Sequence, residues 1–243
     1  MAPQANAASA TRPIVPVNGG VRSVNVWMNL GVANYDGLQT HITYRGNARM
    51  LAALSYTLSK ATNTTEPDGN GVGPNDANIA RLAEAERGPS VVDQRHRAVI
   101  TFSYNLPYNI TTGTVTQLAS ARPFSATTGL DNNGDGNNYD RPVIDGKVIG
   151  KSVFRGTGTQ DVSVFFEARL RSSGRAIVLH VEGFNLFNHA NMLWRGQTIY
   201  GDGANPNPRF GQLVSVGTAT NALPSLMSIA PPRMVQFQVR FVF

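Results

Sequence analysis

The sequence contains no cysteine among its 243 residues, so a disulfide framework and a thiolate metal site are both excluded. Charged residues make up only 15% of the chain, whereas a soluble domain usually carries about a quarter. No stretch approaches the roughly 18 consecutive apolar residues of a membrane helix. The longest apolar runs, such as residues 50–54, are far shorter. These absences exclude a transmembrane helix but leave a transmembrane barrel open, because its lipid-facing residues alternate with polar ones.

Concentrated charge and catalytic motifs are also missing. The 21 Lys and Arg give a net charge of +6, but they are scattered singly, without a dense basic run interleaved with aromatic residues. We therefore expect no nucleic-acid partner. No serine elbow or paired-carboxylate motif is present, and Asp93 and His96 have a D-x-x-H spacing without a second ligand pair. The sequence predicts neither an enzyme nor a cofactor or metal site.

What the sequence does contain is segments in which apolar and polar residues alternate with a period of two. Short turns and long polar connections separate these segments. The 24 Gly and 14 Pro are typical of short strands with many turns. Apolar and polar residues alternate in about eight segments, of which 110–121 is Thr-rich and has no clear apolar face. These segments are residues 24–29, 38–45, 50–59, 97–106, 110–121, 162–171, 177–182 and 235–243.

The connections between these segments alternate in length. Tight turns at residues 45–48, 107–109 and 172–174 alternate with long connections at 61–93, 122–161 and 189–233. Short periplasmic turns and long extracellular loops are typical of outer-membrane barrels. The prediction is therefore an all-β fold, an antiparallel transmembrane β-barrel segment of about eight strands. A soluble β-sandwich or jelly roll also alternates apolar and polar residues, but it predicts shorter loops.

Candidate site residues fall on the predicted polar face and in one loop. Glu167, Arg169, Glu182 and Arg240 share the polar parity of their strands, and in a barrel this face is the lumen. The segment 131–136 matches the first half of a calcium loop, with Asp131, Asn133 and Asp135 as ligands. Its twelfth position is Pro142 rather than an acid, and Asn, Asp and Gly are also ordinary turn formers.

Several short runs resemble one family. The run EGFNLFNHAN at residues 182–191 is similar to a strand end of TonB-dependent receptors, especially the Oar-like receptors with a carboxypeptidase-regulatory-like domain. The final strand resembles the outer-membrane C-terminal signature, with Val235, Phe237, Val239, Phe241 and Phe243 in alternation. Further pieces agree in the family's order: NYDGLQ at 34–39, SYTLSK at 55–60, DQRHR at 93–97, ARPFS at 121–125 and DRP at 140–142.

The resemblance implies the C-terminal barrel portion of a receptor in the Gram-negative outer membrane. Residues 1–20 are expected to be an irregular leader or upstream loop, and residues 21–243 the barrel portion. Residues 1–20 show no secretory signal pattern, so we expect a fragment. The family takes up a nutrient ligand and is driven by the TonB energy-coupling complex through a plug domain, which we do not find here. The resemblance also implies that the barrel-assembly machinery recognises the last strand and that outer-membrane lipid surrounds the barrel.

Two other readings of the sequence stay open. One is a small stand-alone eight-stranded outer-membrane protein with a structural or adhesive role, since eight strands can close a barrel. The other is a secreted soluble β domain that binds calcium or glycan through the loop at Asp131. Neither the transported ligand nor the oligomeric state can be read from these patterns.

Overall fold

The structure is a computed structural model that describes residues 31–64, 87–130, 140–191, 197–201, 206–211, 213–214, 227–228 and 232–243. Regular structure in these ranges is almost entirely β. The helical elements there are two single 3-10 turns, η2 (Asn47–Arg49) and η3 (Pro107–Asn109). None of the helices in the described ranges is long and apolar enough to cross a membrane.

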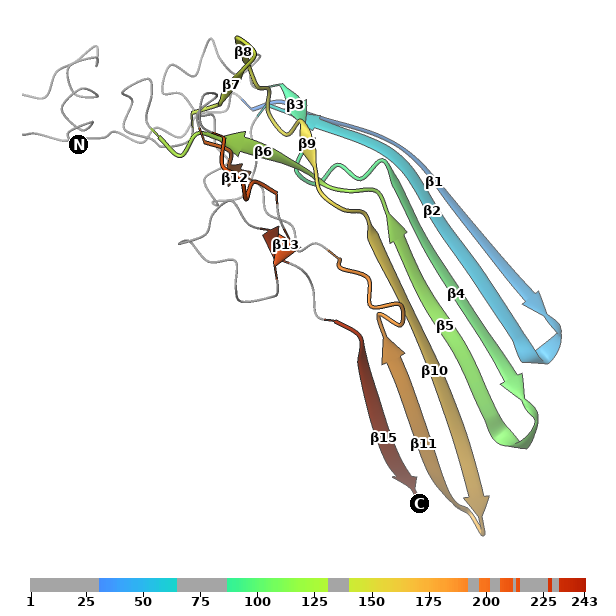
Figure 1. The fold of residues 1–243 in the computed structure, drawn as a ribbon. Coiled ribbons are helices and arrows are strands. Elements are labelled where there is room, and N and C mark those ends of the chain that lie inside the picture. Colours follow the sequence, from blue (N-terminus) through green and yellow to red (C-terminus); the bar gives the residue numbers. More distant parts are fainter. Residues whose placement is uncertain are drawn as a thin grey trace, which may run out of the picture.

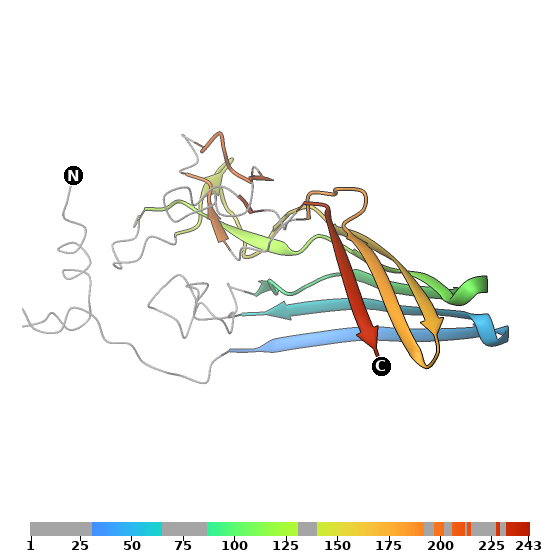
Figure 2. The same ribbon diagram turned by 90° about the horizontal axis from the view of Figure 1, so that it is seen from below.

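One large antiparallel sheet dominates the molecule, and its long strands pair in chain order (Figure 1). A short strand, β3 (Gly88–Pro89), pairs with the end of β2. The order is β1 (Ala33–Gly46), β2 (Met50–Asn63), β4 (His96–Leu106), β5 (Ile110–Ala119), β10 (Thr159–Ser172), β11 (Arg175–Phe184) and β15 (Met234–Val242). Sequential antiparallel pairing is the meander of an up-and-down barrel, and Figure 2 shows it as one curved layer.

The two ends of the sheet differ, and this confirms the predicted alternation of connections. At one end, here the turn end, β1, β4 and β10 each pass to the next strand within four residues. There Ser173 and Gly174 have φ of 48° and 80°, as a two-residue hairpin turn requires. At the other end, here the loop end, the connections span residues 64–95, 120–158 and 185–233.

Seven of the predicted strand segments are confirmed. Most of the strands extend beyond the predicted bounds, whereas β5 ends at Ala119 and β15 at Val242, short of residues 121 and 243. The segment at 24–29 lies outside the described residues. The Thr-rich segment becomes β5, and its register settles the face that the sequence left undefined: Ile110 and Leu118 point the same way as the apolar residues of β4 and β10.

The long connections are more structured than the sequence predicted. Residues 122–160 contain β6 (Pro123–Thr127) and β9 (Phe154–Arg155), which pair with each other, while β12 (Gln197–Ile199) pairs with β6 in parallel. Two further ladders are β7 (Val143–Ile144) with β8 (Lys147–Val148), and β13 (Leu213–Val214) with β14 (Met227–Ser228). Alternation could not reveal these strands, because each is at most five residues long.

Most buried side chains of the described residues lie at the loop end rather than on the large sheet. They include Val91, Phe124 and Ala126, together with polar residues such as Asp93 and Lys151. An aromatic cluster there has neighbouring ring centroids 5.0–6.5 Å apart and consists of Phe124, Phe154, Tyr200 and Phe210. Among the described residues the large sheet itself forms a single layer.

Candidate functional site

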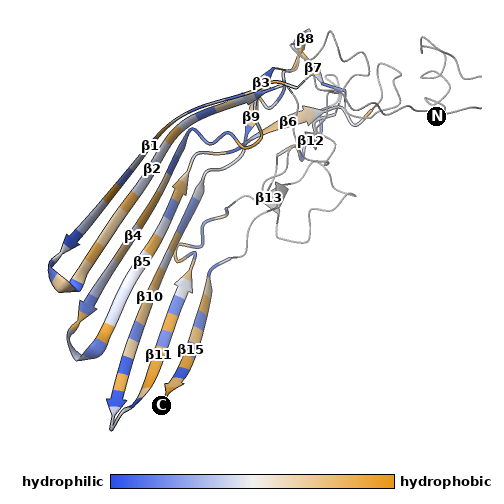
Figure 3. Cartoon of the chain, turned by 180° about the vertical axis from the view of Figure 1, so that it is seen from behind, coloured by the Kyte–Doolittle hydropathy of each residue, from blue (hydrophilic) through white to orange (hydrophobic). Residues whose placement is uncertain are grey.

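The register of the sheet gathers the apolar side chains onto one face, here the apolar face. Cross-strand partners in an antiparallel sheet point to the same side, and the partners continue unbroken from β1 to β15. One such row joins Leu54, Ile100 and Val162 through Thr116. Figure 3 shows the alternation as stripes along the strands. The other face is here the polar face.

The apolar face is exposed over its whole breadth. Leu38 on the first strand and Phe237 on the last are 61% and 75% exposed, and Ile100 and Phe166 between them are exposed as well. A soluble monomer rarely exposes a contiguous apolar patch beyond a few hundred Å². A surface of seven strands with this character is therefore suited to hydrocarbon rather than to water.

Polar residues mark where the apolar face ends, and this boundary runs obliquely across the strands. Toward the loop end it passes from Asp36 and Lys60, which are opposite each other, to His96 on β4 and Gln160 on β10. We followed this boundary through the cross-strand partners from β1 to β10, which are four strand-to-strand intervals apart. Over these intervals the boundary shifts toward the turn end twice, by two residues each time. A shift of about one residue per strand is the stagger of strands tilted by about 35–45° in a barrel.

The register places the four predicted polar-face charges together on that face of the last three strands. Glu167 lies opposite His180, whose ring nitrogens lie 3.5 Å from carboxylate oxygens of Glu167 and Glu182. The imidazole also stacks on Phe165, with centroids 5.7 Å apart. Sequence reasoning missed this cluster, because its members come from two strands.

The two arginines form the next row toward the turns. Arg169 and Arg240 lie opposite Val178 from either side. Val178 between them is buried. Going toward the turns, the four charges thus occupy three successive rows of the polar face: Glu182, then Glu167, then the two arginines.

The C-terminal signature residues lie on the apolar face of β15. Val235, Phe237, Val239 and Phe241 are each opposite an apolar-face position of β11, and Phe243 follows the strand. Within the described residues β15 pairs only with β11, and β1 only with β2. The sheet therefore has two edges.

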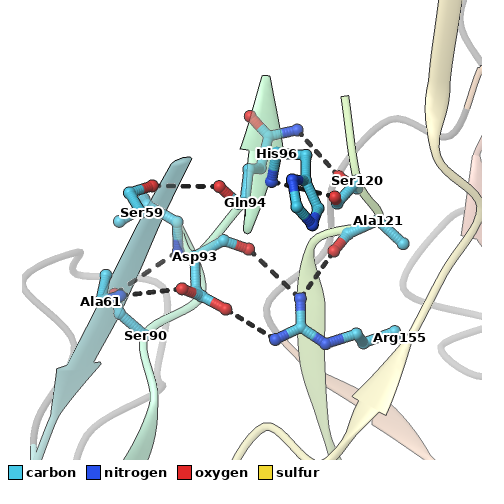
Figure 4. Close-up of polar contacts among 10 residues, drawn as sticks. Ser59, Ala61, Ser90, Asp93, Gln94, His96, Ser120, Ala121 and Arg155 are labelled. Atoms are coloured by element: carbon cyan, nitrogen blue, oxygen red, sulfur yellow. Dashed lines mark hydrogen bonds and ion pairs between the residues drawn. The ribbon is translucent and has the colours of Figure 1, made fainter. Parts of the chain in front are cut away.

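An ion pair between a buried carboxylate and an arginine whose side chain is 36% exposed organises the loop end (Figure 4). The side chain of Asp93 is 2% exposed, and its Oδ2 lies 2.6 Å from Nη2 of Arg155. Its Oδ1 accepts a hydrogen bond of 2.8 Å from the backbone N–H of Ala61. Arg155 Nη1 donates to the carbonyl of Ala121 at 2.8 Å. One carboxylate and one guanidinium thus join the ends of β2 and β5 to β9.

The residues after Asp93 continue this cross-linking. The backbone carbonyl of Gln94 accepts a hydrogen bond from Ser59 Oγ, and its side-chain Nε2 donates one to the backbone carbonyl of Ser120. The His96 N–H donates to Ser120 Oγ, and its Nδ1 lies 2.7 Å from the Tyr56 hydroxyl. Asp93 and His96 therefore serve different partners, and no group of three or more metal-binding side chains occurs in the described part of the chain.

The calcium candidate cannot be placed in the same way. Asp131, Asn133 and Asp135 lie outside the described residues. Calcium binding at this loop remains a hypothesis from the sequence.

A tilted antiparallel sheet, apolar on one face and polar on the other, with short turns at one end and long loops at the other, defines a transmembrane β-barrel. A family model described as outer membrane beta barrel domain matches residues 1–157. The chain belongs to this family, and its place is the outer membrane. The comparison with curated proteins finds no match. The matched range ends before β10, but β10, β11 and β15 continue the same sheet.

Proposed function

We propose that this chain is the C-terminal barrel portion of a TonB-dependent receptor that takes up a nutrient ligand. The observation that carries the proposal is the pair of sheet edges at β1 and β15. In hydrocarbon an unpaired backbone N–H or C=O costs several kcal/mol, so a membrane sheet must close. Further strands of a larger receptor barrel would supply the partners for both edges.

The loop end supports a receptor rather than a plain pore. The connections there bury polar residues, pair into small sheets and hold a cluster of four aromatic rings. Ordered surface loops on a rigid scaffold are where binding residues usually lie. The proposal is a non-enzymatic role in which these loops capture the ligand.

The run that carries the family resemblance has a structural role here. Asn185 lies just after β11 with φ of 48°, and its side chain bonds the N–H and the carbonyl of His189. Asn191 then bonds the N–H and the carbonyl of Gln160 on β10. The two asparagines shape the exit from β11 and attach it to its neighbour. The resemblance therefore supports the receptor architecture without identifying the ligand.

The proposal entails specific partners. Outer-membrane lipid would contact the apolar face, and the barrel-assembly machinery would recognise β15. A plug domain would fill the lumen and connect it to the TonB energy-coupling complex. We propose no nucleic-acid partner.

Two measurements test the proposal. An antibody against residues 233–243 should detect, in native outer membranes, a band far heavier than 26.1 kDa. A membrane band near that mass that shifts on boiling would instead indicate a small stand-alone barrel. Uptake of labelled nutrients is then compared between cells with and without the gene, with and without a protonophore. We expect one nutrient class whose accumulation needs both the gene and the proton gradient; uptake that ignores the protonophore would rule out energy coupling.

A further inference from the structure

We infer that Asp93 and Arg155 form a latch that holds the outer loops against the polar face at the mouth of the barrel. Residues 88–95 continue the large sheet beside β2, and the loops that the latch holds are residues 120–128 and 140–158, here the loop cap. The latch needs only the barrel, not the uptake function, so either proposal can fail without the other.

The first step is the side of the sheet on which the loop cap sits. Ala61 and Asn63 have the parity of the polar face, and both are buried at the loop end of β2. Lys151 of the loop cap donates to the side chain and the carbonyl of Asn63. Lys60, which precedes Ala61 and has the parity of the apolar face, is exposed. The loop cap therefore packs over the polar face, which in a barrel faces the lumen.

The second step is what joins the loop cap to the sheet. Arg155 follows Asp93 by 62 residues, and their ion pair connects two different long connections. The backbone of Gly88 also approaches Lys151 so closely that an added Cβ would lie 2.6 Å from the Lys151 carbonyl oxygen. Asp93 is thus the position where residues 88–95, which pair with β2, meet β9 of the loop cap.

The third step is the effect of removing one partner. A buried carboxylate that loses its cation keeps its desolvation penalty, so breaking such a pair is strongly unfavourable to the arrangement that holds it. Moving the loop cap away would return Asp93 to water. Loss of Arg155 therefore favours displacement of the loop cap, whereas loss of a cation of the same loops that does not pair with Asp93 has no such effect.

The test uses the absence of cysteine. A single Thr57→Cys change places a thiol on the polar face of β2 below the loop cap, and an Asp145→Cys change marks its exposed outer turn. Intact cells producing the full-length protein are treated with a bulky membrane-impermeant maleimide. We expect Arg155→Met to raise the labelling rate at position 57 about tenfold, equivalent to about 1.4 kcal/mol, and to leave position 145 unchanged.

Lys147→Met is the matched control, because it removes a cation of the same loop cap that does not pair with Asp93. It should label like the parent at both positions. If Arg155→Met assembles but labels position 57 at the parent rate, the latch is refuted. If Arg155→Met does not assemble, Asp93→Asn replaces it, since an amide oxygen can still accept from the Ala61 N–H. An unchanged rate with Asp93→Asn would equally overturn the inference.

Discussion

The assignment of the two faces can be tested by one pair of arginine substitutions on a single strand. Ile100 and Thr101 are neighbours near the middle of β4 and point to opposite faces. Ile100 lies in the row with Leu54 on the apolar face, and Thr101 lies opposite Ala53 and Val115 on the polar face. An arginine on the lipid face near the bilayer midplane costs about 2–4 kcal/mol. Ile100→Arg should therefore lower the folding equilibrium about 30- to 700-fold.

Thr101→Arg is the control, because it adds the same side chain one residue away. Its guanidinium would stay in the aqueous lumen, so we expect an effect within about 1 kcal/mol. The measurement is the fraction of the full-length protein that resists protease in isolated outer membranes and migrates as the folded form without boiling. Equal losses from both substitutions, or a greater loss from Thr101→Arg, would refute the assignment of the faces.

Three further outcomes follow from single positions. Gly113→Ala should destabilise the barrel by about 1–3 kcal/mol in urea titrations, because the new Cβ would lie 2.6 Å from the Phe165 ring. Gly183→Ala is the control and should be nearly neutral, because its Cβ would meet nothing nearer than 3.9 Å. Tyr108→Asn should stabilise by about 1 kcal/mol, since a tyrosine at φ of 65° is strained and its side chain is 89% exposed; an unchanged midpoint would argue against strain there. Removing calcium with EGTA should leave the melting temperature of the detergent-purified protein unchanged, whereas a calcium-dependent rise abolished by Asp131→Asn would establish the loop as a calcium site.

The sequence predicted the large sheet well because alternation is a local property. Each strand of the sheet records its own two faces, and the apolar parity of Leu38, Ile42 and Tyr44 is confirmed by their partners on β2. The turns were equally local, since Asn47 and Gly174 favour the positive φ that they adopt. β5 was the exception, because threonine fits either side of a sheet. Only its partners on β4 and β10 decided its face.

The loop end could not be predicted, because its order depends on long-range contacts. Phe124 and Phe154 stack across a separation of 30 residues, and Phe210 reaches them from a third connection. β6 and β9 are too short to show a period. Nothing local to Arg155 indicates that it will meet Asp93. The sequence therefore described these connections as polar loops and missed the small aromatic core within them.

The segment at Asp93 shows why spacing alone is weak evidence for a metal site. A D-x-x-H pattern places two potential ligands three residues apart, but here that stretch runs from the loop into β4, so the two side chains meet different neighbours. The carboxylate of Asp93 satisfies a backbone donor and a cation, and these two bonds occupy both of its oxygens. His96 contacts Tyr56 on the apolar face, at the oblique boundary where that face ends. The same few residues thus end the membrane-facing surface on one side of the sheet and attach the outer loops on the other, which fits an outer-membrane barrel better than it fits a metal-binding domain.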